Sequence, residues 1–85
     1  MEVNLAYYRK KDWRKFLNMI DDRDSMHDSW EDWYNSYLKI KLELSTKGMI
    51  VNDIVVDLHE LRKYCLNRGL KINGKARSQF VSNMK

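Results

Sequence analysis

Side chains able to do chemistry are most concentrated in the stretch DDRDSMHDSWEDW, residues 21–33, which holds six acids, one histidine and two tryptophans. Carboxylates and imidazoles bind metal ions and transfer protons, so both kinds of site have to be considered. A calcium loop of the EF-hand type requires glycine at its sixth position and glutamate at its twelfth. Counted from Asp22, these positions hold His27 and Trp33, and no second histidine or cysteine follows at zinc-ligand spacing. We therefore expect no metal site.

The same stretch contains the signals of a helix boundary. Ser25 and Ser29 are each followed three residues later by an aspartate, Asp28 and Asp32, which resembles the motif that caps a helix N-terminus. Acids in a first helical turn, such as Glu31, are also favoured by the positive end of the helix dipole. We interpret the stretch as the junction between two helices, with a solvated acidic face. A docking surface for a protein partner is the alternative.

The sequence carries no catalytic signature. It contains no nucleophile elbow, no phosphate-binding glycine loop and no HExxH zinc motif. His59 and Cys65 are six residues apart, so on one helix they project in different directions. Cys65 falls on the apolar side of its helix, where cysteine behaves as a small hydrophobic residue. We expect a protein that is not an enzyme, has no catalytic residue and needs no cofactor.

Apolar spacing locates the elements that position these groups. Two stripes recur at the three- and four-residue steps of a helix. The stripes are Trp13, Phe16, Leu17 and Ile20, then Trp30, Trp33, Tyr34, Tyr37, Ile40 and Leu44. They predict helices at about 11–23 and about 29–46. We assign the tryptophans to the core, rather than to a cage for methylated amines or a platform for bases, because they lie on these stripes.

The second half of the chain predicts an extended segment and two more helices. MIVNDIVV, residues 49–56, is β-branched and apolar, which is typical of an extended connection or a short strand. Asp57 then caps a helix at about 57–68, and a last helix spans about 75–84. We expect a small, mainly α, single domain over residues 1–85, with about four helices packed as a bundle.

Charge is unevenly distributed along the chain, although 16 basic and 12 acidic side chains give a net charge of only +4. Residues 1–20 carry +3, residues 21–60 carry −6, and residues 61–85 carry +7 with no acidic residue. A basic end on an acidic body predicts a polyanionic partner such as nucleic acid. Uneven charge that serves only solubility is the alternative.

The last third of the chain, IVVDLHELRKYCLNRGLKINGKARSQFVSNM at residues 54–84, carries a specific spacing around two glycines. Apolar residues stand eleven, eight, five and four positions before the first glycine: Leu58, Leu61, Tyr64 and Cys65. That glycine, Gly69, lies within an Arg-Gly-Leu triplet, and Gly74 follows it by five residues. This pattern resembles the helix–extended loop–helix motif of SAP domains.

The resemblance implies binding of double-stranded DNA with little sequence specificity. The alternative is that two packed helices with a basic outer face only complete the fold. It covers no residue before position 54, and it departs from the family after Gly74. The family has a lysine two residues beyond this glycine, and an apolar pair at five and six residues beyond it. This chain has Ala76 at the first of these positions, and its apolar pair, Phe80 and Val81, comes one residue later.

Basic residues around the two glycines are the predicted contacts. Free N–H groups at the start of a helix attract phosphate, and Lys75 and Arg77 lie beside them in the last helix. Leu70 and Ile72 are expected to fill the gap between the last two helices. The predicted nucleic-acid-binding residues are Arg62, Lys63, Arg68, Lys71, Gly74, Lys75 and Arg77, which we expect to contact mainly phosphates. The alternative function is a protein-interaction or dimerisation module that uses the acidic 21–32 segment and the aromatic helix faces.

Cellular context is suggested by several missing signals. No run of about 18 apolar residues exists to cross a membrane, and MEVNLAYYRKKDW at the start has no signal-peptide core. The single cysteine forms no internal disulfide. We expect a cytoplasmic protein without a membrane partner. Its expected partner is DNA or another polyanion, with a protein partner or a second copy as the alternative.

Overall fold

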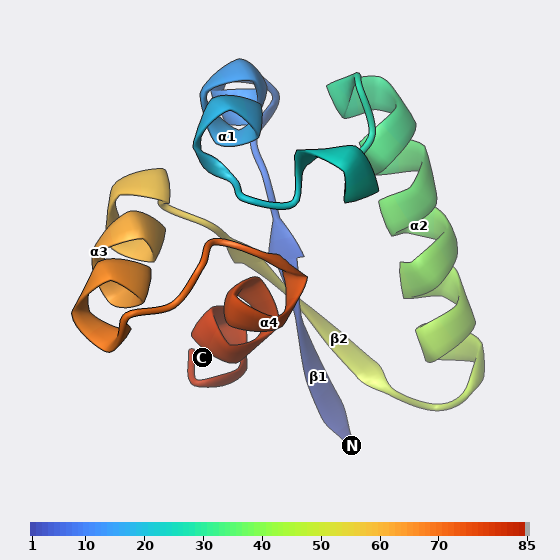
Figure 1. The fold of residues 1–85 in the computed structure, drawn as a ribbon. Coiled ribbons are helices and arrows are strands. Elements are labelled where there is room, and N and C mark those ends of the chain that lie inside the picture. The colour runs from blue at the N-terminus through green and yellow to red at the C-terminus, as the bar shows by residue number, and fades with distance from the viewer. Residues whose placement is uncertain (85) are drawn as a thin grey trace.

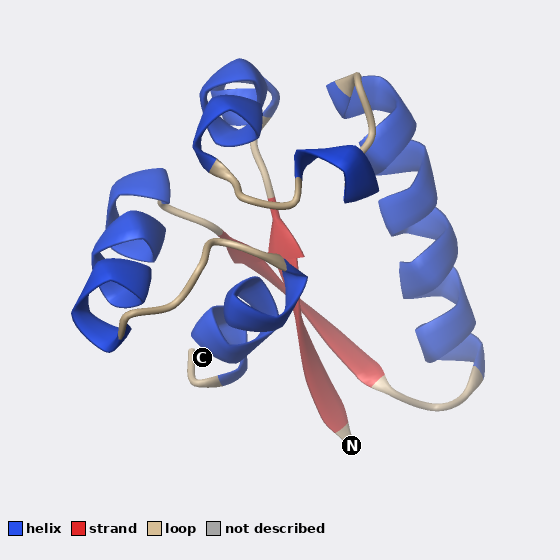
Figure 2. Ribbon diagram, viewed as in Figure 1, coloured by secondary structure: helices blue, strands red, loops and turns tan. Residues whose placement is uncertain are grey.

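The chain forms four helices around a pair of strands in a computed structural model that describes residues 1–84 (Figure 1). In chain order these are β1 (Glu2–Tyr7), α1 (Trp13–Met19), α2 (Trp30–Thr46), β2 (Ile50–Val55), α3 (Leu58–Arg68) and α4 (Gly74–Ser82). Short 3-10 turns occur at Lys10–Asp12 and Arg23–Ser25. Figure 2 shows how far helix predominates over strand, so the predicted mainly α class is confirmed.

The extended segment predicted at 49–56 is a true strand, β2, and its partner β1 was not predicted. The two strands pair in parallel, from Glu2 opposite Ile50 to Tyr7 opposite Val55. Parallel neighbours need a long crossover, which α1 and α2 supply here. The sequence signal for β1 was the alternation of polar and apolar residues in EVNL, the first four residues of the strand, which is short enough to be missed.

The two faces of this small sheet pack against different helices. The ring of Tyr7 lies 5.5 Å from that of Tyr37, so this residue and Leu5 face α2. The side chain of Asn4 donates to the carbonyl of Val81 at 2.8 Å, so Asn4 and Ala6 face α4. Figure 1 shows the result, with α2 on one side of the strands, α3 and α4 on the other, and α1 beyond the end of β1.

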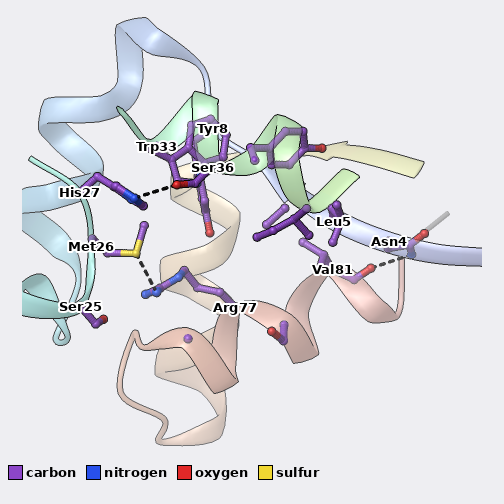
Figure 3. Close-up of a pocket in the computed structure, with 15 residues that line it drawn as sticks. Asn4, Leu5, Tyr8, Ser25, Met26, His27, Trp33, Ser36, Arg77 and Val81 are labelled. Atoms are coloured by element: carbon purple, nitrogen blue, oxygen red, sulfur yellow. Dashed lines mark hydrogen bonds between the residues drawn. The ribbon is translucent and has the colours of Figure 1, made fainter. Parts of the chain in front are cut away.

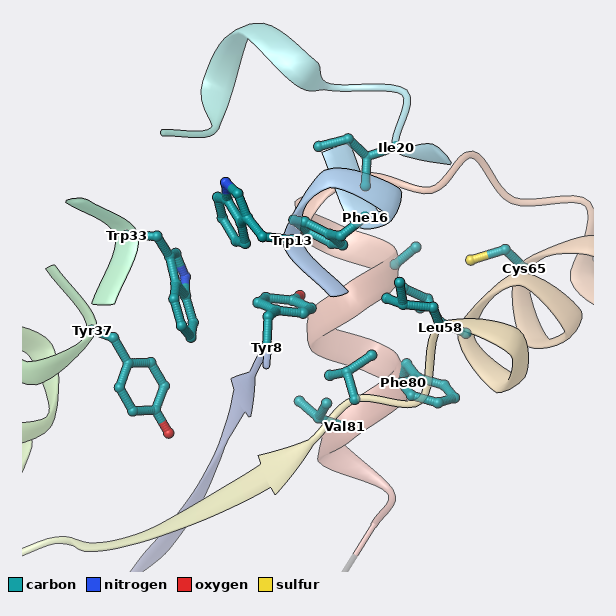
Figure 4. Close-up of a cluster of buried hydrophobic side chains, with 13 residues drawn as sticks. Tyr8, Trp13, Phe16, Ile20, Trp33, Tyr37, Leu58, Cys65, Phe80 and Val81 are labelled. Carbon is teal, nitrogen blue, oxygen red and sulfur yellow. The ribbon is translucent and has the colours of Figure 1, made fainter. Parts of the chain in front are cut away.

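The core lies where the ends of the two strands meet α1, α3 and α4 (Figure 4). Its most completely buried side chains are Phe16, Val56, Leu61 and Cys65. Tyr8 stacks on Phe16 with 4.1 Å between ring centroids, which joins β1 to α1. Trp13 and Trp33 are also buried and their rings lie 5.6 Å apart, as expected for core residues rather than an aromatic cage.

The first helix is shorter than predicted, because tertiary contacts end it. The expected range was about 11–23, but Ile20 is already extended, with φ −84° and ψ 153°. The next residue, Asp21, donates its N–H to the carbonyl of Ile72 at 2.8 Å. This bond to the α3–α4 connection replaces the helical bond that would have continued α1.

Two apolar residues do not lie where the spacing placed them. Leu70 is 38% exposed and does not fill the gap between α3 and α4, whereas Ile72 does pack against the core. Ile40 is 49% exposed although it belongs to the apolar stripe of α2. The cause is the narrowness of the two-stranded sheet, which is too small to cover the second half of α2.

Within residues 1–84, no helix has the length and apolar character required to span a bilayer.

Replacing Leu61, which has no exposed surface, with alanine should lower the free energy of unfolding by about 3 kcal/mol, because it leaves a cavity. Urea denaturation followed by tryptophan fluorescence measures this loss. Leu66 on the same helix is 70% exposed and serves as the matched control. Its replacement with alanine should change stability by less than about 0.5 kcal/mol. Equal losses in the two variants would contradict the placement of α3.

Candidate nucleic-acid interface

Five of the seven predicted contact residues are exposed cations on α3, on the α3–α4 connection and on the first turn of α4. They are Arg62, Lys63, Arg68, Lys71 and Lys75, which we call the basic α3–α4 surface. Within residues 1–84 none of them forms an ion pair with a carboxylate. Their charges are therefore available to an anionic partner.

Helix α3 is positioned by local signals at both of its ends. The carboxylate of Asp57 accepts a hydrogen bond from the N–H of Glu60 at 3.1 Å and so caps the N-terminus. Gly69 ends the helix in the left-handed conformation, with φ 64°, which strains any residue with a Cβ. Because Leu61 and Cys65 point into the core, Arg62 and Lys63 must point outward.

The cations do not form one uniform cluster. Arg62 and Lys63 line a shallow hollow on the outer side of α3 together with the exposed Leu66. Arg68 lies on another side of this helix, with its guanidinium 4.0 Å from the centre of the Tyr64 ring. Stacking of this kind leaves the in-plane N–H groups of arginine free to bind phosphate oxygens.

Arg77 was predicted as an exposed phosphate contact, but in the structure it is buried and is not part of this surface. Its residue exposure is 7%, because it lies on the side of α4 that also buries Ala76 and Val81. Its two terminal nitrogens donate to the two carboxylate oxygens of Asp22 at 2.8 and 2.9 Å. A buried guanidinium needs such a partner, and this pair satisfies it internally.

The predicted phosphate position at the start of α4 is also occupied from within the chain. The N–H of Gly74 donates to a carboxylate oxygen of Asp22 at 3.1 Å, and the N–H of Ala76 donates to the side chain of Asn73 at 3.0 Å. These are the N–H groups that a phosphate would have used. Gly74 is therefore a structural contact of Asp22 in this fold.

Asp21 and Asp22 together hold the α3–α4 connection, and we call these two residues the aspartate clamp. Asp21 exchanges two hydrogen bonds with Ile72, from its own N–H at 2.8 Å and to its carboxylate at 2.7 Å. Asp22 binds Gly74 and Arg77, and it also accepts from the hydroxyl of Ser25 at 2.9 Å. Sequence reasoning missed these roles because the partners lie more than 50 positions away.

The rest of the acidic stretch forms the predicted helix boundary, but only one of the two predicted serine caps is present. Ser29 caps α2 by accepting from the N–H of Asp32 at 3.1 Å, whereas Ser25 does not cap that helix. Arg23 pairs with Asp28 at 2.8 Å on the surface. No group of three or more potential metal ligands gathers anywhere in the described part of the chain.

The titratable groups of the core are held in one protonation state. Hydrogen bonds from Arg77 are the main reason that the pKa of Asp22 lies below its usual value. Burial raises the pKa of Tyr8 to about 12, so this neighbour of Arg77 stays neutral. Burial also raises the pKa of the Cys65 thiol, which makes it a poor nucleophile.

Comparison with known proteins gives no further guide: no family model, no curated protein and no solved structure matches this chain.

Replacing Asp22 with alanine should lower the free energy of unfolding by about 3 kcal/mol, because it leaves the buried Arg77 charge without a partner. Urea denaturation provides the measurement. Asp24, an exposed acid two residues later, is the matched control, and its replacement with alanine should cost less than about 0.5 kcal/mol. A loss as small for Asp22 as for Asp24 would contradict the role of the clamp.

Stability should also depend on pH through Asp22. Because its folded-state pKa is lowered, the stabilisation is complete above the unfolded pKa of about 3.9 and is lost as pH falls through the folded value. Unfolding curves of the wild type and of Asp22→Asn, recorded from neutral to acidic pH, should therefore converge below about pH 4. A constant difference between the two proteins across this range would contradict the assignment.

Proposed function

We propose that this protein is a non-enzymatic domain that binds DNA through phosphate contacts, with little reading of base sequence. The observation that carries the proposal is the basic α3–α4 surface, whose five exposed cations have no carboxylate partner within residues 1–84. Gly74 and Arg77, which the sequence placed in the same interface, are excluded from it because Asp22 binds them.

The distribution of charge supports a polyanionic partner. Residues 61–85 contain seven basic and no acidic residues, so this part of the sequence supplies no neutralising group of its own. Two acids that bind this part of the chain, Asp21 and Asp22, direct carboxylate oxygens at the α3–α4 connection and at Arg77. Binding to DNA would neutralise the exposed cations and release the counterions condensed on the phosphates.

Low sequence specificity follows from the kind of group that the surface presents. Lys63, Lys71 and Lys75 carry point charges on flexible side chains, which suit phosphates better than the edges of bases. The resemblance of residues 54–84 to SAP domains favours the same function. The loss of Arg77 from the interface weakens that resemblance but leaves the exposed cations unchanged.

The alternative protein-interaction module loses much of the surface that suggested it. Asp21 and Asp22 are engaged with the α3–α4 connection, and Asp28 and Glu31 are paired with Arg23 and Lys10. The aromatic residues Trp33 and Tyr37 are buried. Asp21, Asp22, Trp33 and Tyr37 are therefore not free to bind a protein partner.

Reversing Lys71 and Lys75 to glutamate should weaken binding to a short duplex of random sequence at least about tenfold at low salt, because two phosphate contacts become repulsive. Anisotropy of the labelled duplex, titrated between about 50 and 200 mM salt, gives affinity and salt dependence. The slope of log K against log salt should fall in magnitude by about 0.9 for each phosphate that is no longer neutralised. The pair Arg62→Glu and Lys63→Glu should behave in the same way.

Lys39 and Lys47 on and after α2 provide the control, since both are exposed and neither forms an ion pair within residues 1–84. Their reversal changes the net charge by the same amount but lies outside the basic α3–α4 surface. It should leave the salt slope unchanged. Equal weakening by the control and the test variants, or no binding by the wild type at low salt, would overturn the proposal.

A further inference from the structure

One edge of strand β1 has no neighbouring strand among residues 1–84. The carbonyl of Tyr7 accepts from the N–H of Val56 at 2.9 Å, so Tyr7 directs its backbone groups toward β2. In a parallel ladder this direction alternates from residue to residue, so Leu5 also bonds to β2 while Asn4 and Ala6 face away from it. The N–H and C=O groups of these two residues therefore point out of the sheet on its open side.

A hollow of about 390 Å³ lies along this edge, between α2 and α4 (Figure 3). Its lining includes Leu5, which faces α2, and Ala6, which faces α4. A hollow that touches both faces of one strand has to open at the edge of that strand. Ile40 of α2 and Ser78 of α4 form its two side walls.

The hollow is closed at one end and continues along β1 at the other. The closed end consists of Met26 and His27, and His27 is joined to Ser36 of α2 with 3.1 Å between Nε2 and Oγ. The sulfur of Met26 accepts from Arg77 at 3.5 Å. The carbonyl of Tyr8 is already used by the indole N–H of Trp30 at 2.7 Å. The open edge therefore begins at Ala6 and extends back toward Asn4.

We propose that this groove binds an extended segment of a partner protein, which adds to β1 as a third strand. The four outward backbone groups of Asn4 and Ala6 are donors and acceptors at strand spacing, which is what an extended chain recognises. Because α2 and α4 flank the edge, a single strand fits between them. A second copy of this domain would bring its own flanking helices into the same space.

The lining defines the chemistry of the segment. Ile40, Val81 and Leu5 are apolar, and Ser36 and Ser78 are small and neutral. Apart from His27, the charged side chain among the described lining residues is Arg77, and its positive charge is balanced by the carboxylate of Asp22. The segment is therefore uncharged and mainly apolar, and its successive side chains face α2 and α4 in turn.

The probe is a displayed library of random heptapeptides, selected on the full-length chain and then synthesised. Ser78→Trp places a bulky side chain in the groove, and Gln79→Trp, at an exposed position of α4 outside the lining, is the matched control. Selected peptides should bind the wild type and Gln79→Trp equally, and bind Ser78→Trp at least about tenfold more weakly. Failure to select any peptide with this preference overturns the proposal.

Amide hydrogen exchange identifies the binding mode. In the free protein the N–H of Ala6 should exchange fast and that of Leu5 slowly. A peptide at a hundred times its Kd should slow the exchange of Ala6 and Asn4 by about 100-fold. Peptide binding without this protection overturns strand addition. Protection that grows with protein concentration alone, without peptide, would assign the groove to a second copy and overturn the proposed partner.

Discussion

The bidentate pair between Asp22 and Arg77 is the interaction on which the other features depend. It joins the segment after α1 to α4 across 55 positions of sequence. The same carboxylate also accepts a hydrogen bond from the first N–H of α4. A helix of nine residues is marginal without tertiary support, so α4 depends on these bonds for its place. The adjoining bonds between Asp21 and Ile72 hold the α3–α4 connection in the same way.

The pair also divides the charges of the chain into two groups with different roles. Arg77 is drawn inward and neutralised, while the cations of the basic α3–α4 surface remain exposed to solvent. On the other side of α4, the contact between Arg77 and Met26 helps to close the end of the groove along β1. Lys75 of α4 belongs to the basic surface, and Ser78 and Val81 of α4 line the groove, so one helix contributes to both regions.

Local signals predicted most of the fold, and partners distant in sequence account for the rest. Asp57 and Gly69 were recognised as the ends of α3 because caps are encoded within a few residues. Strand β1 was missed because its pairing partner lies 48 positions later. Arg77 was placed on the basic surface because nothing near it in sequence shows that Asp22 would bind it. Six of the seven predicted interface residues are exposed and Arg77 is buried, and the two that do not join the basic α3–α4 surface, Gly74 and Arg77, both bind Asp22.

A double-mutant cycle between Asp22 and Arg77 tests the central claim most directly. Asp22→Ala, Arg77→Met and the double variant would be unfolded in urea, and the coupling free energy obtained from the three losses of stability. If the buried pair organises the structure, the double variant should lose at least about 2 kcal/mol less than the sum of the single variants. Losses that add to within about 0.5 kcal/mol would show that the two residues act independently, and would contradict the account.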